Sequence, residues 1–327
     1  MPVSYGDAIR VRERHDSRMK KMAFIFPGQG AQYVGMGKEF YEQIPACKEV
    51  YELASKATGL DVAALCFEEN DKLNITEYTQ ICMLTTEVAI LKALQEKGFT
   101  PAVTAGLSLG EYGAVVAAGV LSMEDAFKVV RKRGIYMQEA VPTGGAMAAV
   151  LGLDAEAIEK ACNETDGIVS IANYNCPGQI VITGEEAAVQ AAGEACKAAG
   201  AKRVLPLNVS GPFHSAMLVD AGKKLGEELA QVEVQDFDIP YLANVTADYV
   251  TSKEVVKDLL EQQVSASVRW QQTVERMIAD GVEEFVEIGP GKTLSGFMKK
   301  INRDVAVCNI DKMEDFMNFL ETHSVKS

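Results

Sequence analysis

The stretch Gly106-Leu107-Ser108-Leu109-Gly110 decides the fold, because it joins a strand pattern to a helix pattern. Residues 102–107 form a short apolar run typical of a buried strand, and residues 111–118 have a helical pattern. Glycines permit a tight turn here, and the start of the helix supplies free amides. A Gly-x-Ser-x-Gly in this setting projects its serine from the sheet edge, which predicts Ser108 as a nucleophile. A plain turn in which Ser108 only caps the helix is the alternative.

Short apolar strands alternate with helices on both sides of this turn. We expect strands at 22–26, 102–107, 241–245, 284–288 and 305–310, and helices at 36–57, 79–97, 111–118 and 122–140. The last of these helices has Ser122 as its expected N-cap, with Asp125 three residues later. This alternation predicts an α/β fold with a parallel sheet covered by helices on both faces.

The middle of the chain has a different order of elements. Strands are expected at 146–151, 168–172, 179–183 and 203–207, with helices at 154–163 and 185–199. The order β-α-β-β-α-β is that of ferredoxin-like folds. We therefore expect a large, hydrolase-like α/β catalytic domain made of residues 22–142 and 207–327, with a ferredoxin-like subdomain inserted at 143–206.

Composition excludes several classes of function. The net charge of −14 argues against a nucleic-acid substrate and gives no general attraction to anionic membranes. No apolar run approaches the ~18 residues of a membrane span, so a soluble protein is expected. Seven cysteines without metal-ligand spacing predict reduced thiols, a cytoplasmic location and no bound metal. Residues 1–21 are richer in basic side chains and are interpreted as a flexible leader or an added extension.

A serine hydroxyl needs a base within hydrogen-bond reach, and the chain has three histidines. His15 lies in the polar leader and His323 lies near the end, so both are expected to be solvated. His214 follows Gly211-Pro212-Phe213 after a strand end and is predicted to be the base. No Asp or Glu between Ser108 and His214 lies on an evident strand-end loop, which counts against a plain hydrolase triad.

Six motifs in order carry a resemblance to a known family. They are Phe26-Pro27-Gly28-Gln29-Gly30-Ala31-Gln32, Gly106-Leu107-Ser108-Leu109-Gly110-Glu111-Tyr112, Arg133-Gly134 with Met137-Gln138-Glu139-Ala140-Val141-Pro142, Asn173-Tyr174-Asn175-Cys176-Pro177-Gly178-Gln179, Gly211-Pro212-Phe213-His214 and Glu287-Ile288-Gly289-Pro290-Gly291. Together they resemble the malonyl-CoA:acyl carrier protein transacylases, over residues 22 to about 316. The resemblance implies a ping-pong transfer of malonyl from coenzyme A to the phosphopantetheine thiol of acyl carrier protein, as in fatty acid biosynthesis, with polyketide synthesis left open as the alternative. Both thiol compounds are then substrates, and no cofactor is expected.

The resemblance also implies roles for single residues. Ser108 would carry the malonyl group and His214 would move the proton, steered by a backbone carbonyl that falls at Arg269. The backbone amides of Gln29 and Leu109 match the oxyanion hole of the family, and a glycine-flanked loop and a helix start suit that purpose. A dinucleotide-binding loop at 28–33 is excluded, because position 33 is a tyrosine rather than the required glycine.

Substrate contacts follow from the same resemblance. Arg133 matches the arginine that holds the malonyl carboxylate, a task that suits its planar fork, although without the resemblance a solvated helix charge is the favoured interpretation. Phe213 matches a bulky ring that leaves no room for an α-methyl group, and core packing explains it equally well. Asn175 is a weaker candidate for lining the site. Leu107 replaces the histidine that many members have before the serine, and it is expected to shape the pocket.

The resemblance also implies an acidic carrier protein, which would have to dock on local basic residues because the chain itself is acidic. Candidates are Lys202, Arg203, Lys292, Lys299, Lys300 and Arg303, although a solvated helix face explains the later ones almost as well. Two other functions remain open at this stage. One is a serine-dependent acyl-ester or thioester hydrolase, and the other is a non-catalytic scaffold that binds acyl carriers.

Overall fold

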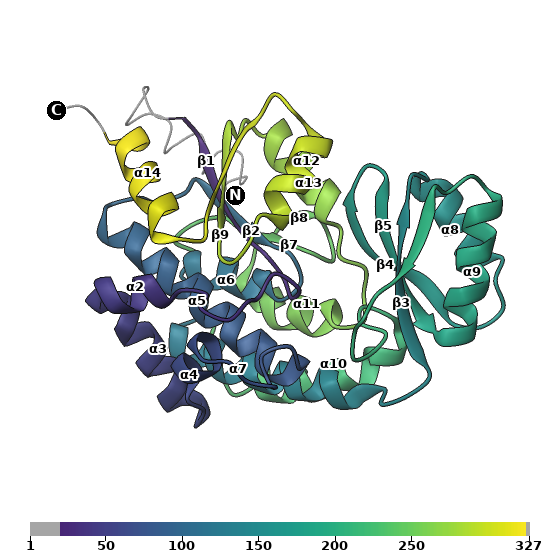
Figure 1. The fold of residues 1–327 in the computed structure, drawn as a ribbon, viewed down its shortest axis with the longest axis horizontal. Helices are drawn as coiled ribbons and strands as arrows, with labels where there is room; N and C mark the ends of the chain where they lie inside the picture. The colour runs from purple at the N-terminus through teal and green to yellow at the C-terminus, as the bar shows by residue number, and fades with distance from the viewer. Residues whose placement is uncertain (1–19, 325–327) are drawn as a thin grey trace.

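The structure is a computed structural model that describes residues 20–324. The leader expected at 1–21 lies almost wholly outside the described residues, and so does His15. Figure 1 shows two bodies side by side: a parallel sheet surrounded by most of the helices, and a smaller sheet at the right with helices α8 and α9. The predicted fold class, an α/β core with a small ferredoxin-like subdomain, is confirmed.

The large sheet has four parallel strands in the order β10-β9-β1-β2. They are β1 (Met22–Phe26), β2 (Val103–Gly106), β9 (Glu284–Ile288) and β10 (Ala306–Ile310). Side chains of β1 alternate between two hydrophobic cores: Phe24 and Phe26 enter one, and Ala23 and Ile25 enter the other. This alternation with burial on both faces is what a parallel sheet covered by helices requires.

Helices cover both faces of this sheet. On the Phe24 side lie α5 (Thr76–Glu96), α6 (Gly110–Ala117) and α7 (Met123–Ala140). On the other side lie α12 (Trp270–Ala279) and α13 (Thr293–Ile301), with Trp270 fully buried against the strands. As expected, the Ser122 side chain caps α7 by accepting from the Asp125 amide at 3.1 Å.

The remaining α-helices are α2 (Lys38–Gln43), α3 (Pro45–Thr58), α4 (Val62–Phe67), α10 (Val219–Leu229), α11 (Val256–Gln263) and α14 (Met313–His323). Two sequence predictions fail in this group. The single helix expected over 36–57 is wrong, because Ile44 is extended before Pro45 and splits it into α2 and α3. The expectation of a fully solvated His323 is also wrong: its Nε2 lies 2.8 Å from Glu284 Oε1, and only 21% of its side chain is exposed.

The second sheet is antiparallel in the order β4-β5-β3-β6. Along the chain its elements are β3 (Gly145–Leu151), α8 (Ala155–Asn163), β4 (Val169–Cys176), β5 (Gln179–Glu185), α9 (Glu186–Ala198) and β6 (Arg203–Pro206). This is the predicted β-α-β-β-α-β order, whereas the exact domain boundaries stay a prediction. Strand β4 joins the larger body, since the Tyr174 amide donates to the Val268 carbonyl at 2.9 Å.

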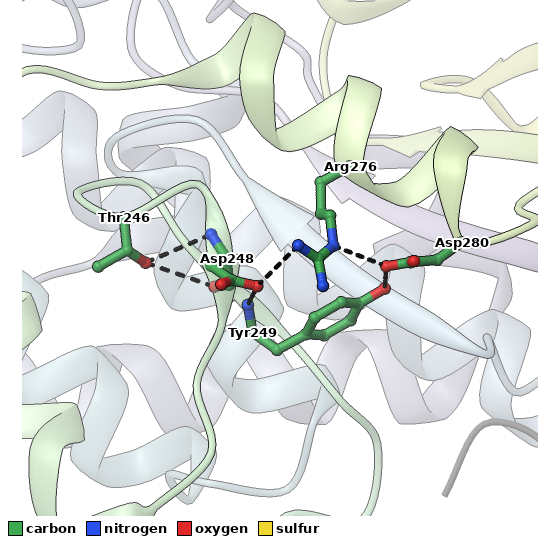
Figure 2. A network of polar contacts seen from close by, with 5 residues as sticks. All are labelled: Thr246, Asp248, Tyr249, Arg276 and Asp280. Atoms are coloured by element: carbon green, nitrogen blue, oxygen red, sulfur yellow. Dashed lines mark hydrogen bonds and ion pairs between the residues drawn. The ribbon is translucent and has the colours of Figure 1, made fainter. Parts of the chain in front are cut away.

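A short hairpin lies beside β2. It consists of β7 (Leu242–Ala243) and β8 (Asp248–Tyr249), and Tyr241 forms a parallel bridge with Thr104. The strand expected over 241–245 is therefore too long, because the chain turns at Asn244. Figure 2 shows how the hairpin is tied to α12: the Tyr249 hydroxyl donates to Asp280 at 2.6 Å, and the Arg276 guanidinium pairs with Asp248 at 3.7 Å. In the same view Thr246 hydrogen-bonds to the backbone of Asp248 and closes the turn.

All seven cysteines lie within residues 20–324 and none of them forms a disulfide. Over the same residues, no helix combines the length and the apolar character needed to cross a membrane.

Candidate active site

Ser108 occupies a strained turn between β2 and α6. Its φ of 55° lies in the left-handed region, which is unfavourable for a residue with a Cβ and marks sites where the surroundings impose the conformation. Two glycines make the turn possible. A Cβ on Gly106 would lie 1.9 Å from the Gly110 carbonyl oxygen, and a Cβ on Gly110 would lie 2.0 Å from that of Phe26. The turn therefore presses the start of α6 against the end of β1.

His214 is hydrogen-bonded to the serine. Its Nε2 lies 2.8 Å from Ser108 Oγ, and its Nδ1 lies 2.8 Å from the carbonyl oxygen of Gln263. A carbonyl oxygen can only accept, so Nδ1 carries the proton and Nε2 presents its lone pair to the hydroxyl. His214 also has a positive φ, 59°, and its amide donates to the Val264 carbonyl at 3.1 Å. The end of α11 thus fixes the imidazole.

The carbonyl that steers the histidine is that of Gln263, and the expectation of Arg269 is wrong. The Arg269 carbonyl instead accepts from the amide and hydroxyl of Thr273, at 3.0 and 2.7 Å, in the first turn of α12. The Arg269 guanidinium lies 5.3 Å from the centre of the Tyr174 ring. The last carbonyls of a helix have no partner within it, and Gln263 at the end of α11 offers such a carbonyl to His214.

Arg133 is a large, charged side chain buried in the site. Only 1% of it is exposed, and its two terminal nitrogens donate to Gln80 Oε1 at 2.8 Å and Gln263 Oε1 at 2.9 Å. One of these nitrogens also lies 3.3 Å from Ser108 Oγ. Within residues 20–324 the guanidinium makes no ion pair, and its Nε has no hydrogen-bond partner. Neutral amides thus orient the cation beside the nucleophile without neutralising it.

Burial sets the protonation of the groups around Ser108. Burial, and next the charge of Arg133, lowers the pKa of His214 to about 4, so the imidazole is neutral at pH 7. Burial raises the pKa of Glu111 to about 8, against the opposing effects of the Asn244 amide and of Arg133. Burial also lowers the pKa of Arg133, yet a guanidinium remains protonated in proteins. At pH 7 the site therefore carries an excess positive charge.

Gln29 and Leu109 line the cavity of Ser108 from two different segments of the chain. Within the described residues the backbone N–H groups of Gln29 and Leu109 have no intramolecular hydrogen-bond partner. The Gln29 side chain is held by Thr76, with Nε2 2.9 Å from Oγ1. The two loops touch, because a Cβ on Gly28 would lie 2.7 Å from the Leu107 carbonyl oxygen. This arrangement offers two donors to an oxyanion.

The cavity that contains Ser108 has a volume of about 600 Å³ and lies between the two sheets. Leu107, Phe213 and Asn175 all line it, so the structure brings these sequence candidates together. Asn175 is 7% exposed, and its Oδ1 has no partner among the described residues. Phe213 also belongs to the large hydrophobic core, so the same side chain both packs in the core and lines the cavity.

Residues 20–324 hold no cluster of three or more His, Cys, Asp or Glu side chains suited to a metal.

Four buried polar residues of the site were missed by the sequence reasoning. They are Gln80, Glu111, Asn244 and Gln263, each no more than 1% exposed. Three are uncharged amides from separate elements, and no motif or spacing distinguishes them from surface amides. Gln80 offered a weak signal, because it interrupts the buried side of a helix that was expected over 79–97.

Comparison with known proteins agrees with this geometry. Residues 23–314 match the acyl transferase domain family. The malonyl CoA-acyl carrier protein transacylase of Bacillus subtilis is 47% identical over 309 residues, 93% of this chain and 98% of the relative. The crystal structure of MCAT from Streptococcus pneumoniae has a TM-score of 0.90 at 49% identity, covering 92% of this chain and all of that one. A malonyl-transacylase solved with a type II PKS acyl-carrier protein has a TM-score of 0.90 at 42% identity and covers 93% of this chain and 100% of its own. The chain belongs to the acyl transferase domain family and, within it, to the malonyl CoA-acyl carrier protein transacylases.

Proposed function

We propose that the protein transfers a malonyl group from coenzyme A to the phosphopantetheine thiol of acyl carrier protein, through a malonyl ester on Ser108. Coenzyme A thioester and phosphopantetheine thiol are both substrates, and no cofactor takes part. Relatives of 45–47% identity over 93% of the chain carry the name of this transacylase. We propose a role in fatty acid biosynthesis, and the alternative is polyketide synthesis, since one relative was solved with a type II PKS acyl-carrier protein.

The observation that carries this function is the buried guanidinium of Arg133, 3.3 Å from Ser108 Oγ. A buried cation without an ionic partner is costly, and an incoming carboxylate removes that cost by forming a paired, hydrogen-bonded ion. In a malonyl thioester, one methylene group separates the carboxylate from the thioester carbonyl. Binding that carboxylate at Arg133 therefore brings the carbonyl to the serine, and an acetyl group gains no such contact.

The first half-reaction forms the malonyl ester. Ser108 Oγ attacks the thioester carbonyl while His214 Nε2 takes the hydroxyl proton, and the Leu109 and Gln29 amides stabilise the oxyanion. The C–S bond then breaks, and the coenzyme A sulfur leaves with the proton from Nε2. The Gln263 carbonyl, 2.8 Å from Nδ1, keeps the imidazole oriented and favours its transient positive charge.

The second half-reaction reverses these steps with a new thiol. His214 takes the proton of the phosphopantetheine thiol, whose sulfur attacks the malonyl ester, and Ser108 recovers its proton as the C–O bond breaks. Arg133 holds the malonyl carboxylate throughout, which keeps the ester in one geometry until the thiol arrives.

Exposed basic side chains suit the acidic carrier protein. Lys202 and Arg203 are exposed at the start of β6, and Lys292, Lys299, Lys300 and Arg303 are exposed on or beside α13. The chain just after β6 and the first residues of α13 both line the cavity, so a carrier docked on these cations can reach Ser108. The free thiols of all seven cysteines support a cytoplasmic location.

An acceptor assay tests the function against hydrolysis. The enzyme is incubated with malonyl-CoA, with and without a carrier protein bearing phosphopantetheine, and malonyl-carrier and free malonate are both measured. Malonyl-carrier is expected as the main product, at a rate that depends on carrier concentration. Free malonate formed at the same rate with or without carrier would instead identify a hydrolase.

A further inference from the structure

The side-chain amide of Asn244 bridges two residues of the nucleophile turn. Its Nδ2 donates to the Gly106 carbonyl at 2.6 Å, and its Oδ1 accepts from the Ser108 amide at 2.7 Å. Strand β7 runs beside β2 and ends one residue before Asn244. The side-chain amide therefore takes the place of a peptide group and continues β-type pairing past the end of β2, where the main chain of β7 has turned away.

This bridge acts on a backbone that needs support. Ser108 has a φ of 55°, and a non-glycine residue stays in that region only where its surroundings fix it. Asn244 holds the amide of Ser108, and Gln263 Nε2 donates to the Ser108 carbonyl at 2.9 Å. Gln263 Nε2 also lies 3.3 Å from Asn244 Oδ1. The two side-chain amides together clamp both peptide groups of the serine.

Asn244 is itself held independently of the serine. The backbone amide of Asn244 donates to Glu111 Oε1 at 2.5 Å, and its backbone carbonyl accepts from the Arg269 backbone amide at 3.1 Å. Its hairpin is fixed to α12 through Asp280, as Figure 2 shows. Asn244 is fully buried and is not among the described residues that line the cavity, so it acts on substrate only through Ser108.

We infer that Asn244 is a positioning residue, which holds Ser108 Oγ in line with His214 and Arg133 by clamping the turn at Gly106 and Ser108. This role rests on the proposed function of Ser108. Loss of the Asn244 side chain slows attack of Ser108 on the thioester without weakening the binding of malonyl-CoA, because the binding contacts belong to other side chains.

The first test compares Asn244→Ala with a matched control, Thr104→Val. Thr104 lies in β2, is fully buried, and its Oγ1 donates to the Phe24 carbonyl at 2.9 Å, so Thr104→Val also removes a buried side-chain bond to backbone. Transfer of malonyl to Ser108 is followed in rapid-quench single-turnover experiments. The acylation rate of Asn244→Ala is expected to fall about 10²-fold at an apparent affinity within about threefold of wild type. Thr104→Val is expected to stay within about twofold in both.

The second test uses Asn244→Asp, which has the same shape. A protonated aspartic acid donates its O–H to the Gly106 carbonyl and accepts from the Ser108 amide, whereas the ionised form cannot donate. The acylation rate of Asn244→Asp relative to wild type is therefore expected to be near one at pH 5 and to fall as pH rises toward 10, because burial raises the pKa of the introduced carboxyl as it raises that of the neighbouring Glu111. Glu111, His214 and Arg133 surround the turn in both proteins, so their own titration affects both rates. A residue that only stabilised the fold would give a ratio independent of pH.

Two results would overturn the role of Asn244: acylation of Asn244→Ala within about twofold of Thr104→Val, or a flat ratio for Asn244→Asp. If Asn244→Ala fails to fold, the pH dependence of Asn244→Asp decides alone. Failure of the proposed function has a different signature. It would appear as the absence of malonyl on Ser108 of the wild-type protein, whatever the variants do.

Discussion

Two fully buried ionisable side chains, Arg133 on α7 and Glu87 on α5, lie in opposite circumstances. Arg133 donates to two glutamines and to Ser108 beside a cavity. Neither carboxyl oxygen of Glu87 has a partner among the described residues. Burial, and next the charge of Glu287, raises the pKa of Glu87 well above its usual value, so Glu87 is held neutral.

Hydrogen-bond partners determine whether a buried ionisable group keeps its charge. Amide oxygens accept from two of the five N–H donors of Arg133 and leave its charge available to a ligand. Glu87 receives no such support and gives up its charge instead, at a cost that the rest of the core offsets. Partnered burial beside a cavity marks the functional group, and unpartnered burial marks a cost in stability.

The largest expected effect comes from removing the partnered charge. Arg133→Ala is expected to lower kcat/KM for malonyl-CoA by about 10²- to 10³-fold, because the malonyl carboxylate loses a buried, bidentate partner. The rate with acetyl-CoA should change much less, so the preference for malonyl over acetyl disappears. Steady-state kinetics with both thioesters measure this, with Glu87→Gln as a control expected to retain the preference. Unchanged discrimination in Arg133→Ala would remove Arg133 from the substrate site.

Replacing the unpartnered group should stabilise the protein. Glu87→Met is expected to raise the free energy of unfolding by on the order of 1–3 kcal/mol at pH 7, because an apolar side chain needs no partner. The folded pKa of Glu87 is raised, so wild-type stability is fully present below about pH 4.5 and declines as pH rises toward that folded pKa. The advantage of Glu87→Met should therefore grow with pH in denaturant titrations. A pH-independent difference would contradict a neutral Glu87.

The smallest expected effect concerns coupling between Arg133 and His214. The Arg133 charge contributes to the lowering of the His214 pKa to about 4. Arg133→Met should raise that pKa toward its ordinary value, although burial keeps it below 6.5. NMR titration of the imidazole checks the shift directly.

The pH dependence of wild-type acylation follows from the same pKa. Acylation by wild type should persist until pH falls toward 4, since the imidazole is neutral above that value. A loss of rate with an apparent pKa near 6.5 would contradict this.

Much of the fold followed from the sequence because local pattern and tertiary burial agree. Apolar runs predicted β1, β9 and all four strands of the antiparallel sheet within a few residues. The helix expected over 36–57 is two helices, because Pro45 forces the residue before it out of the helical conformation. This local effect of proline was visible in the sequence. The short β7 shows the opposite limit, because its end is set by the contact of Asn244 with the neighbouring β2.

The candidate site was predictable where chemistry is carried by distinctive residues. Ser108 was recognisable from its glycines, and His214 by elimination among three histidines. The supporting amides were not, because Asn244 and Gln263 reach the site from elements more than a hundred residues from Ser108. The same distance explains the error at Arg269: which carbonyl faces Nδ1 depends on where α11 ends, a tertiary detail.

The mass of the intact protein after brief exposure to malonyl-CoA shows whether Ser108 carries a malonyl ester. Wild type is expected to gain one malonyl group and to lose it when carrier protein bearing phosphopantetheine is added. Ser108→Ala is expected to gain none under the same conditions. A wild type that stays unlabelled, or a Ser108→Ala variant labelled to the same extent, would contradict a malonyl ester on Ser108.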